Sequence, residues 1–278
     1  MFQTDLLKGK RVLITGGGSG LGKSMGRRLM ELGAELMICG RRGHVLEKTA
    51  KEFEALFSRK VRTHVVDIRS ADAVEQLMDA AFAGGALDVL INNAAGNFIA
   101  RTETLSHRAV DAILNIVLHG TAYCTLAAGR RWIAQGRGGV VVSIVASYAW
   151  TGSPYVVPSA MAKAGVLTMT QSLAVEWGPK KIRTVAISPG TFPTPGAWDR
   201  LVPPAMEASW ETSNPAGRAG AHDELANLCA YLVSDQAAYI NGACVTIDGG
   251  RWLQGAGMFS SLSRLSEAEW QDMRTRGS

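Results

Sequence analysis

The sequence has few cysteines, and they are not arranged as a disulfide framework or a metal site. The four, Cys39, Cys124, Cys229 and Cys244, lie far apart in the 278-residue chain, with no CxxC pair and no histidine at metal-ligand spacing. Disulfide-rich secreted scaffolds and zinc modules need cysteines that are closely spaced or numerous. We therefore expect reduced, mostly buried thiols and no metal.

Long apolar runs are also missing. The hydrophobic stretches are short and broken by glycine, serine or charge, and the N-terminal MFQTDLLKGKR has no apolar signal core. This pattern argues against a membrane span or an export signal. The chain ends in RGS, which differs from the SKL-type peroxisomal signal. We expect a soluble, cytoplasmic protein without a membrane partner.

Charge of one sign is not concentrated anywhere. The formal net charge of +5 is spread along the chain. Nucleic-acid surfaces gather basic residues into a patch or stripe, so we expect no nucleic-acid partner. A small anionic ligand remains compatible with this distribution.

What the sequence does have is a regular alternation of short β-branched runs and stretches of helical period. The expected strands are RVLIT, ELMICG, VRTHVVDI, LDVLINNA, GVVVSIVA, IRTVAISPG and part of YINGACVTIDGG, and the expected helices are Leu21–Leu32, His44–Phe57, Ala71–Ala83, Ser106–Gln135, Pro158–Trp177 and His222–Leu232. Such alternation predicts a parallel sheet covered on both faces. We predict one α/β domain over 1–278, a doubly wound Rossmann fold with seven strands.

Two segments do not fit the alternation. Residues 190–218 are rich in proline, glycine and alanine, and 251–278 follow the last expected strand. Long loops beyond strand carboxyl ends often cover ligands, so we interpret 190–218 as a substrate-loop insertion. The C-terminal extension, with Trp252, Met258 and Phe259, is compatible with lining a pocket or with packing on a neighbouring subunit.

A glycine cluster follows the first expected strand and precedes the first helix. The residues of this cluster are Gly16, Gly17, Gly18, Ser19, Gly20, Leu21 and Gly22. Glycines allow a tight turn and let backbone N–H groups approach a pyrophosphate at a helix N-terminus. The alternative is a merely structural turn, but the position within a strand–turn–helix unit predicts a dinucleotide site.

The end of the second expected strand indicates which dinucleotide binds. NAD enzymes usually place an acidic residue there, whereas this chain has Arg41 and Arg42. Two guanidinium groups suit the 2′-phosphate of NADPH, although a pair of solvated surface arginines has the same sequence. We expect Asp67 to receive the adenine amino group and Asn93, in NNAAG, to lie under the cofactor.

TGGGSGLG, NNAAG, a lysine at position 163 and SPG together resemble the short-chain dehydrogenase/reductase family over essentially the whole chain. The resemblance implies a nicotinamide cofactor, contacts from Lys163 to its ribose, and contacts from Pro189, Gly190, Thr191 and Phe192 after the sixth strand. It also implies a homo-oligomer, usually a tetramer.

The chain departs from the family where the usual catalytic groups stand. Ser159 replaces the tyrosine four residues before Lys163, Ala146 replaces the serine, and Val117 replaces the asparagine of the fourth helix. These gaps, with NNAAGNF, TETLS and SYAWTGSPYVVPSAMAKAG, resemble the mitochondrial and peroxisomal NADPH-dependent 2,4-dienoyl-CoA reductases. That branch implies Tyr148 as the working tyrosine, Asn97 as its partner, and Ser159 with Lys163 at a water.

The implied chemistry explains the departures. Hydride delivery to a dienoyl thioester builds negative charge on the thioester oxygen, and a phenol and a carboxamide can donate hydrogen bonds to it. A serine hydroxyl is a poor acid but can orient a water. Tyr148 could instead cap the core, and Asn97 could satisfy turn backbone groups. Tyr155 is expected to pack as an ordinary aromatic before the helix.

By position, the resemblance implies that Arg69, Phe98, Ser106 and Arg200 contact the acyl-CoA. Single loop arginines are also often only solvated. The resemblance thus implies reduction of a 2,4-dienoyl-CoA to a 3-enoyl-CoA in fatty-acid metabolism. Reduction of another enone or carbonyl by the same scaffold, and a non-catalytic NADP-binding protein, remain as alternatives.

Overall fold

The structure, a computed structural model, describes residues 2–194, 212–257 and 260–276. Its seven strands all run parallel in one sheet of order β3-β2-β1-β4-β5-β6-β7. The strands are β1 (Arg11–Thr15), β2 (Glu35–Gly40), β3 (Arg62–Val65), β4 (Val89–Asn92), β5 (Gly139–Ile144), β6 (Ile182–Pro189) and β7 (Cys244–Ile247). The prediction of a single-domain, doubly wound, seven-stranded Rossmann fold is confirmed.

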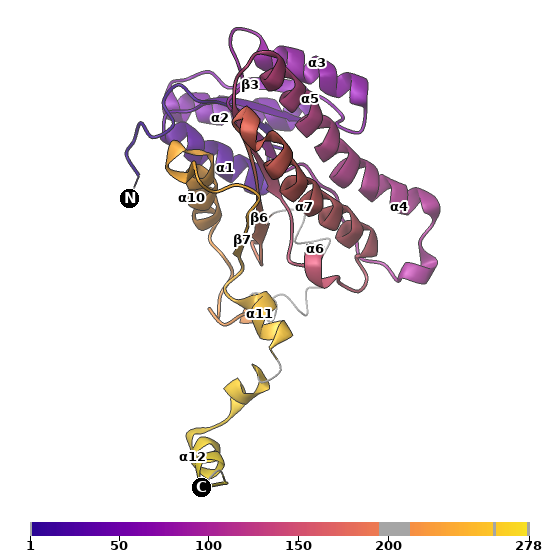
Figure 1. Ribbon diagram of the computed structural model, residues 1–278, viewed down its shortest axis with the longest axis vertical. Helices are drawn as coiled ribbons and strands as arrows, with labels where there is room; N and C mark the ends of the chain where they lie inside the picture. The colour runs from indigo at the N-terminus through magenta and orange to yellow at the C-terminus, as the bar shows by residue number, and fades with distance from the viewer. Residues whose placement is uncertain (1, 195–211, 258–259, 277–278) are drawn as a thin grey trace.

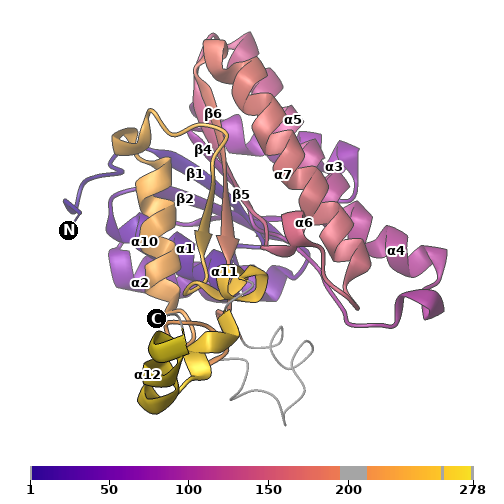
Figure 2. The same cartoon turned by 60° about the horizontal axis from the view of Figure 1, so that its bottom comes forward.

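Helices cover both faces of the sheet. They are α1 (Gly20–Glu31), α2 (Gly43–Phe57), α3 (Ala71–Phe82), α4 (His107–Leu114), α5 (Gly120–Ala134), α6 (Tyr148–Thr151), α7 (Val157–Trp177), α10 (His222–Val233), α11 (Arg251–Ala256) and α12 (Glu267–Arg276). In both views α1, α2 and α10 lie on one face, and α3, α5 and α7 lie on the other (Figures 1 and 2). Short helix α6 and helix α11 lie beyond the carboxyl ends of the strands, and α12 projects away from the body (Figure 1).

The two faces of the sheet contribute to two separate cores. One core gathers β1, β2 and β6 side chains against α1, α2 and α10, with Met25, Leu29 and Phe53 fully buried. The other packs α3, α5 and α7 on the opposite face around Leu77, Met78 and Trp132. Strands β1 and β4 are buried almost throughout, as expected for the centre of a parallel sheet.

The region expected to form one helix, Ser106–Gln135, is divided into two helices and a turn between them. Ser106 is the N-cap of α4, and a π-helical turn at Asn115–His119 joins α4 to α5. The run His107–Ala134 is long and apolar enough to cross a membrane on length and composition alone, but half of its apolar window is buried inside the protein. Such burial is what a core helix of a folded domain shows.

Each of the four cysteines is a free thiol, and three of them are buried. Burial raises the pKa of the Cys124 and Cys229 thiols to about 12, which keeps them protonated and unreactive at neutral pH. The prediction of mostly buried thiols is therefore confirmed.

Close packing of α5 against α7 fixes the helix that carries Ser159 and Lys163. A methyl group at Gly129 in α5 would come within 2.3 Å of the Trp177 ring in α7. We expect Gly129→Ala to lower the free energy of unfolding by about 1–3 kcal/mol, since the helices must move apart. Gly255→Ala in α11 serves as the control, because a Cβ added there would meet no atom of another element within 4 Å. Urea denaturation of both variants measures the difference, and equal stability of Gly129→Ala and wild type would contradict this packing.

Candidate active site

One large cavity, of about 1220 Å³, opens at the carboxyl ends of the strands. Its walls come from the loops after each of the strands β1 to β6, together with α6 and the start of α11. The chain leaves β1 and β4 toward opposite faces of the sheet, which is where doubly wound folds leave a crevice for ligands. The volume exceeds that of an ordinary small-molecule pocket and can hold a dinucleotide with part of a second ligand.

The glycine cluster forms one wall of this cavity, with two kinds of glycine. Gly16 and Gly20 have left-handed φ values of 66° and 54° and line the cavity with Gly18, Ser19 and Leu21. Gly17 and Gly22 do not line it. A Cβ at Gly22 would lie 2.5 Å from the Gly16 carbonyl oxygen, so this glycine allows α1 to pack closely on the turn.

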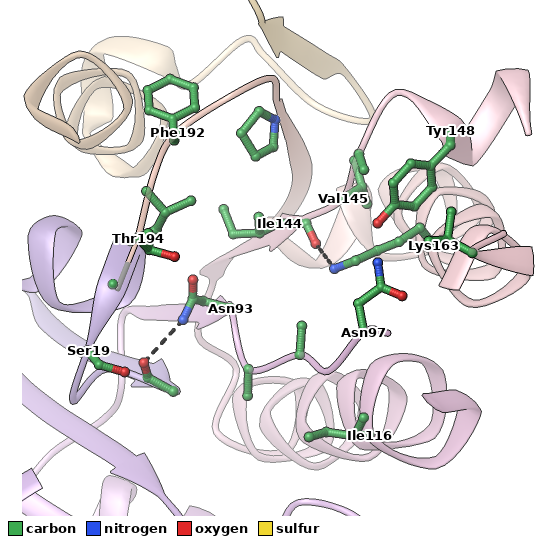
Figure 3. A pocket seen from close by; sticks show the side chains of 18 of the residues that line it. Ser19, Asn93, Asn97, Ile116, Ile144, Val145, Tyr148, Lys163, Phe192 and Thr194 are labelled. Atoms are coloured by element: carbon green, nitrogen blue, oxygen red, sulfur yellow. Dashed lines mark hydrogen bonds between the residues drawn. The ribbon is translucent and has the colours of Figure 1, made fainter. Parts of the chain in front are cut away.

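Asn93 ties the glycine turn to the end of β4. Its side-chain Nδ2 donates to the carbonyl oxygens of Thr15 and Gly16 at 3.0 and 3.3 Å. The backbone N–H groups of Asn93 and Ala94 both donate to the Thr15 hydroxyl, each at 3.0 Å. Because Asn93 also lines the cavity, it both holds the turn and forms the cavity floor, where the sequence placed it (Figure 3).

Arg41 and Arg42 lie at the rim of the cavity after β2, and both are exposed. Arg42 Nη2 donates to Ser19 Oγ at 3.4 Å, across the glycine turn. No carboxylate in the described part of the chain forms an ion pair with either guanidinium. Ser19 and the two arginines therefore form a positively charged corner that suits a phosphate.

Asp67 lines the cavity beyond β3, but Arg69 does not. Arg69 Nε lies 2.9 Å from both carboxylate oxygens of Asp67, and Nη2 lies 2.5 Å from Oδ2. Hydrogen bonds and charge from Arg69 hold the pKa of the Asp67 carboxyl below its usual value. Asp67 thus remains an ionised acceptor, and Arg69 serves as its partner in this structure.

The serine, lysine and tyrosine singled out from the sequence lie together on the opposite side, where Tyr148 and Lys163 line the cavity and the buried Ser159 does not. Tyr148 begins α6, and its hydroxyl lies 3.1 Å from Ser159 Oγ on α7. Ser159 and Lys163, one turn apart on α7, are both buried, and Lys163 Nζ donates to the carbonyl oxygen of Ile144 at the end of β5. Figure 3 shows Tyr148 and Lys163 directed into the same corner of the pocket.

Asn97 faces this corner from the loop after β4 (Figure 3). Its Oδ1 accepts a hydrogen bond from the backbone N–H of Phe98 at 2.9 Å, which fixes the carboxamide. With Oδ1 engaged, the amide nitrogen is the group left for a ligand. Tyr148 and Asn97 thus offer two neutral donors near one point of the cavity wall.

Burial changes the protonation chemistry of this corner. It raises the pKa of the Tyr148 phenol, although the hydrogen bond with Ser159 partly opposes the rise. A phenol with a raised pKa stays protonated and acts as a donor rather than as a base. Burial lowers the pKa of Lys163 to about 8, so the amine can exchange a proton near neutral pH.

The end of β6 and the segment after it form the part of the wall between the glycine turn and the corner with Tyr148 and Lys163. Pro189, Gly190, Thr191 and Phe192 all line the cavity, and their contacts with the cofactor, which the family resemblance implies, stay a prediction. A Cβ at Gly190 would lie 2.6 Å from Asp248, so only glycine allows the segment to pass this close to the end of β7. The Gly190 N–H donates to the Ile247 carbonyl at 2.9 Å, which anchors the segment to β7.

Three of the residues predicted to contact an acyl-CoA occupy other places in the described structure. Phe98 is half-buried in a small apolar cluster with Ile113, Val117 and Ala162. Ser106 caps α4, where its Oγ accepts from Ala109 N–H at 3.2 Å. Neither these two nor Arg69 lines the cavity, and Arg200 lies outside the described residues. Their substrate contacts remain predictions.

The expectation that Tyr155 packs as an ordinary aromatic is wrong. Its side chain is 56% exposed, and its φ of 64° places it in the left-handed region. Its carbonyl accepts from Ala100 N–H at 3.0 Å, which joins the approach of α7 to the loop after β4. The backbone turn therefore directs Tyr155 to the cavity rim instead of into a core.

Several cavity residues were not selected from the sequence. They include Ile116 in the π-helical turn, Ser147 before α6, Thr194 two residues after Phe192, and Arg251 at the start of α11. Arg251 Nη1 donates to Thr191 Oγ1 at 3.1 Å. Ser147 directly follows Ala146, which stands where the family has its serine, and Arg251 directly follows the DGG turn. Proximity to these motifs is the sequence feature that could have indicated both residues.

Comparison with known proteins places this geometry in context. A family model described as "Enoyl-(Acyl carrier protein) reductase" matches residues 16–251. A protein of Bacillus subtilis named "Probable 2,4-dienoyl-CoA reductase [(2E)-enoyl-CoA-producing]" is 47% identical over 248 residues, 88% of this chain and 97% of the relative. A Caenorhabditis elegans protein, a probable 2,4-dienoyl-CoA reductase named as (3E)-enoyl-CoA-producing, is 41% identical over 281 residues, 98% of this chain and 90% of the relative.

Among solved structures, the chain is similar to a gluconate 5-dehydrogenase from Burkholderia cenocepacia in complex with NADP and tartrate. The TM-score is 0.84 at 28% identity, over 90% of this chain and 98% of that one. The likeness extends over nearly the whole of both chains.

The buried amine of Lys163 should cost stability in a way that depends on pH. Its pKa falls from 10.5 to about 8 on folding. Below pH 8 the amine is charged in both states and the folded state bears the full cost. Between pH 8 and 10.5 the unfolded state binds more protons, so the stability of the wild type rises with pH. Lys163→Met should therefore stabilise the ligand-free protein by about 1–3 kcal/mol at pH 7, with a smaller gain at pH 9.5.

Urea denaturation at the two pH values measures this gain. The control is Lys180→Met, which removes an exposed amine and should change stability by less than about 0.5 kcal/mol at either pH. A difference between Lys163→Met and wild type that does not change with pH would contradict the depressed pKa.

Proposed function

Because the chain belongs to the short-chain dehydrogenase/reductase family of oxidoreductases, we propose that it reduces 2,4-dienoyl-CoA thioesters to 3-enoyl-CoA with NADPH, as an auxiliary step of fatty-acid β-oxidation. NADPH would supply the hydride when bound between the glycine turn and the segment after β6. The names of the two relatives support the substrate class but differ in the product: the Bacillus subtilis relative is named as (2E)-enoyl-CoA-producing and the Caenorhabditis elegans relative as (3E)-enoyl-CoA-producing. The exposed arginine pair beside Ser19 supports the preference for a 2′-phosphate.

The observation that carries this proposal is the pairing of Tyr148 with Ser159 opposite Asn97. A protonated phenol and an amide N–H point to one corner, where they can share the negative charge that develops on a thioester oxygen. Ordinary carbonyl reduction needs a group that gives its proton to the oxygen. Here the phenol's raised pKa favours hydrogen bonding without full proton transfer.

The position of protonation decides the product. Hydride addition at C5 leaves a dienolate whose charge is shared by the thioester oxygen, C2 and C4. A proton at C2 gives the 3-enoyl product, and a proton at C4 gives the 2-enoyl product. With the thioester oxygen held by Tyr148 and Asn97, C2 is two bonds from it and C4 is four. Ser159 and Lys163 adjoin Tyr148, so a water on these two residues would be nearer to C2, which supports the 3-enoyl product.

The direct test compares three thioesters with purified enzyme. We expect NADPH oxidation with 2,4-hexadienoyl-CoA, and little or none with a 2-enoyl-CoA or a 3-ketoacyl-CoA. The product's double bond, located by NMR or mass spectrometry, should lie at C3. A 2-enoyl product would keep the substrate class but overturn the protonation site. No turnover of the dienoyl thioester would overturn the substrate class itself.

Removing the Tyr148 hydroxyl should lower the chemical rate more than binding. We expect Tyr148→Phe to lower kcat on the dienoyl thioester by about 10²–10³-fold, because a donor to the developing oxyanion is lost. The KM for NADPH should change less than about twofold. Tyr239→Phe, at a fully exposed tyrosine, is the matched control and should retain the wild-type rate. A Tyr148→Phe enzyme with normal kcat would leave Tyr148 without a catalytic role.

The arginine pair should set cofactor preference. We expect Arg41→Ala and Arg42→Ala each to raise the KM for NADPH by about 10-fold or more, since a charge-assisted hydrogen bond is worth about 1.5–3 kcal/mol. The KM for NADH, which lacks the 2′-phosphate, should change little. Arg27→Ala removes one equally exposed charge from α1 and serves as the control. Steady-state kinetics with both nucleotides would contradict the assignment if both KM values rose equally.

A further inference from the structure

His222, the first residue of α10, forms hydrogen bonds with two other parts of the cofactor region. Its Nε2 lies 2.7 Å from the carbonyl oxygen of Pro193, in the segment after β6. Its Nδ1 lies 2.8 Å from the hydroxyl of Ser24 on α1, the helix that begins at the glycine turn. A single imidazole therefore bridges the two sides of the cavity's entrance, although it does not line the cavity itself.

The position of the imidazole is set by the packing of α1 against α10. One turn further along, Arg28 Nε on α1 donates to Asn227 Oδ1 on α10 at 2.7 Å. The two helices lie side by side on the same face of the sheet (Figures 1 and 2). The packing of the two helices along their length, rather than the Arg28–Asn227 pair alone, keeps His222 beside Ser24 and Pro193.

The segment that His222 binds, residues 190–194, is also held at the end of β7 and by the residues just before α10. Gly190 N–H is bonded to β7, and Gly220 N–H donates to the Thr191 carbonyl at 2.9 Å. A Cβ at Gly220 would lie 2.4 Å from the Phe192 ring, so the chain just before His222 also packs against this segment. Thr194 then reaches back to the glycine turn, where a Cβ at Gly20 would meet it at 3.4 Å.

Thr191, Phe192 and Thr194 line the cavity on one side, and Gly18, Ser19 and Gly20 line it on the other. Figure 3 shows Thr194 and Phe192 on the same side of the pocket, with Ser19 beyond Thr194. Pro193, whose carbonyl accepts the hydrogen bond from His222, stands in the chain between the lining residues Phe192 and Thr194. Its length therefore helps to fix how far apart the two walls stand.

We propose that His222 is a positioning residue that sets the spacing between the glycine turn and residues 191–194, and thereby the affinity for the nicotinamide dinucleotide. The inference rests on the proposed cofactor but not on the proposed thioester substrate. His222 does not touch the cofactor: it acts through Pro193 on one wall and through Ser24 on the other.

The hydrogen-bond chemistry assigns a role to each ring nitrogen. The Pro193 carbonyl can only accept, so Nε2 must carry a hydrogen and donate it. The Ser24 hydroxyl can donate to Nδ1, or it can accept from a protonated Nδ1 and donate to the Gly20 carbonyl, 3.2 Å away. The bond that reaches the cavity wall therefore depends on the Nε2 position.

This asymmetry gives a sharp set of variants. Glutamine can place an N–H near the position of Nε2, whereas asparagine can reach only the position of Nδ1. We expect His222→Asn and His222→Phe to raise the dissociation constant for NADPH by about 5–10-fold, the effect of losing one hydrogen bond. His222→Gln should stay within about twofold of wild type. Nucleotide fluorescence titration measures all three without any acyl substrate.

Asn227→Ala separates positioning from general stability. It removes the other α1–α10 side-chain pair, further from the cavity, and should lower Tm without changing the NADPH dissociation constant. Should the His222 variants fail to fold, Ser24→Ala leaves the imidazole in place, removes one of its two anchors and should raise the constant by about two- to threefold.

Three outcomes would contradict the inference in whole or in part, and each leaves a different part of the interpretation standing. If wild type binds NADPH and the Asn and Phe variants bind it equally well, only the positioning role of His222 is lost. If wild type binds neither NADPH nor NADH, the proposed cofactor falls and this inference falls with it. Equal losses in the Gln, Asn and Phe variants would also overturn the assignment of the Nε2 bond.

Discussion

The parallel alignment of the strands is the constraint on which the rest of this structure depends. Because all seven strands run the same way, every strand ends at one edge of the sheet, and the loops that follow are brought together there. Between β1 and β4 the chain turns to opposite faces, which leaves a crevice. Thr15 and Asn93 join the two strand ends across it, so these two polar side chains are hydrogen-bonded without closing the cavity.

The polar groups on the far wall are held at a cost that the fold offsets by packing. A tyrosine, a serine and a lysine are withdrawn from water beside the end of β5, and burial is the main cause that raises the pKa of the tyrosine and lowers that of the lysine. The Ile144 carbonyl accepts from the lysine, and Ser159 bonds the tyrosine. Buried groups with few partners and shifted pKa values are typical of functional sites, because ligands can complete what the protein leaves open.

The places of residues that come directly at or after the end of a strand were predictable from the sequence. Five residues of the glycine cluster, Asn93, the arginine pair and residues 189–192 line the cavity, although Gly17 and Gly22 of the cluster do not. Each follows a strand directly, so once the strand is recognised its carboxyl end is located. Residues several positions from a strand end were less predictable. Phe98 packs in an apolar cluster and Ser106 caps a helix, because local packing and capping decide the direction of such side chains.

Tyr155 and His222 are two residues whose surroundings could not be predicted from the local sequence. The tyrosine was expected to pack but is exposed, since a left-handed backbone at that position directs it outward. The histidine carries no sequence motif, yet it bridges α1 and the segment after β6, two elements far from each other in the chain. Neither a backbone turn of this kind nor a contact across nearly 200 residues leaves a local pattern.

The sequence by itself determined the strand–helix alternation, the parallel sheet and the place of the glycine turn, because hydrophobic periodicity and glycine spacing act over a few residues. Only the tertiary structure decided which side chains meet: Tyr148 with Ser159, Arg69 with Asp67, and His222 with both Ser24 and Pro193. Such meetings depend on how whole helices pack on the sheet, and packing is set by contacts between residues that are distant in sequence.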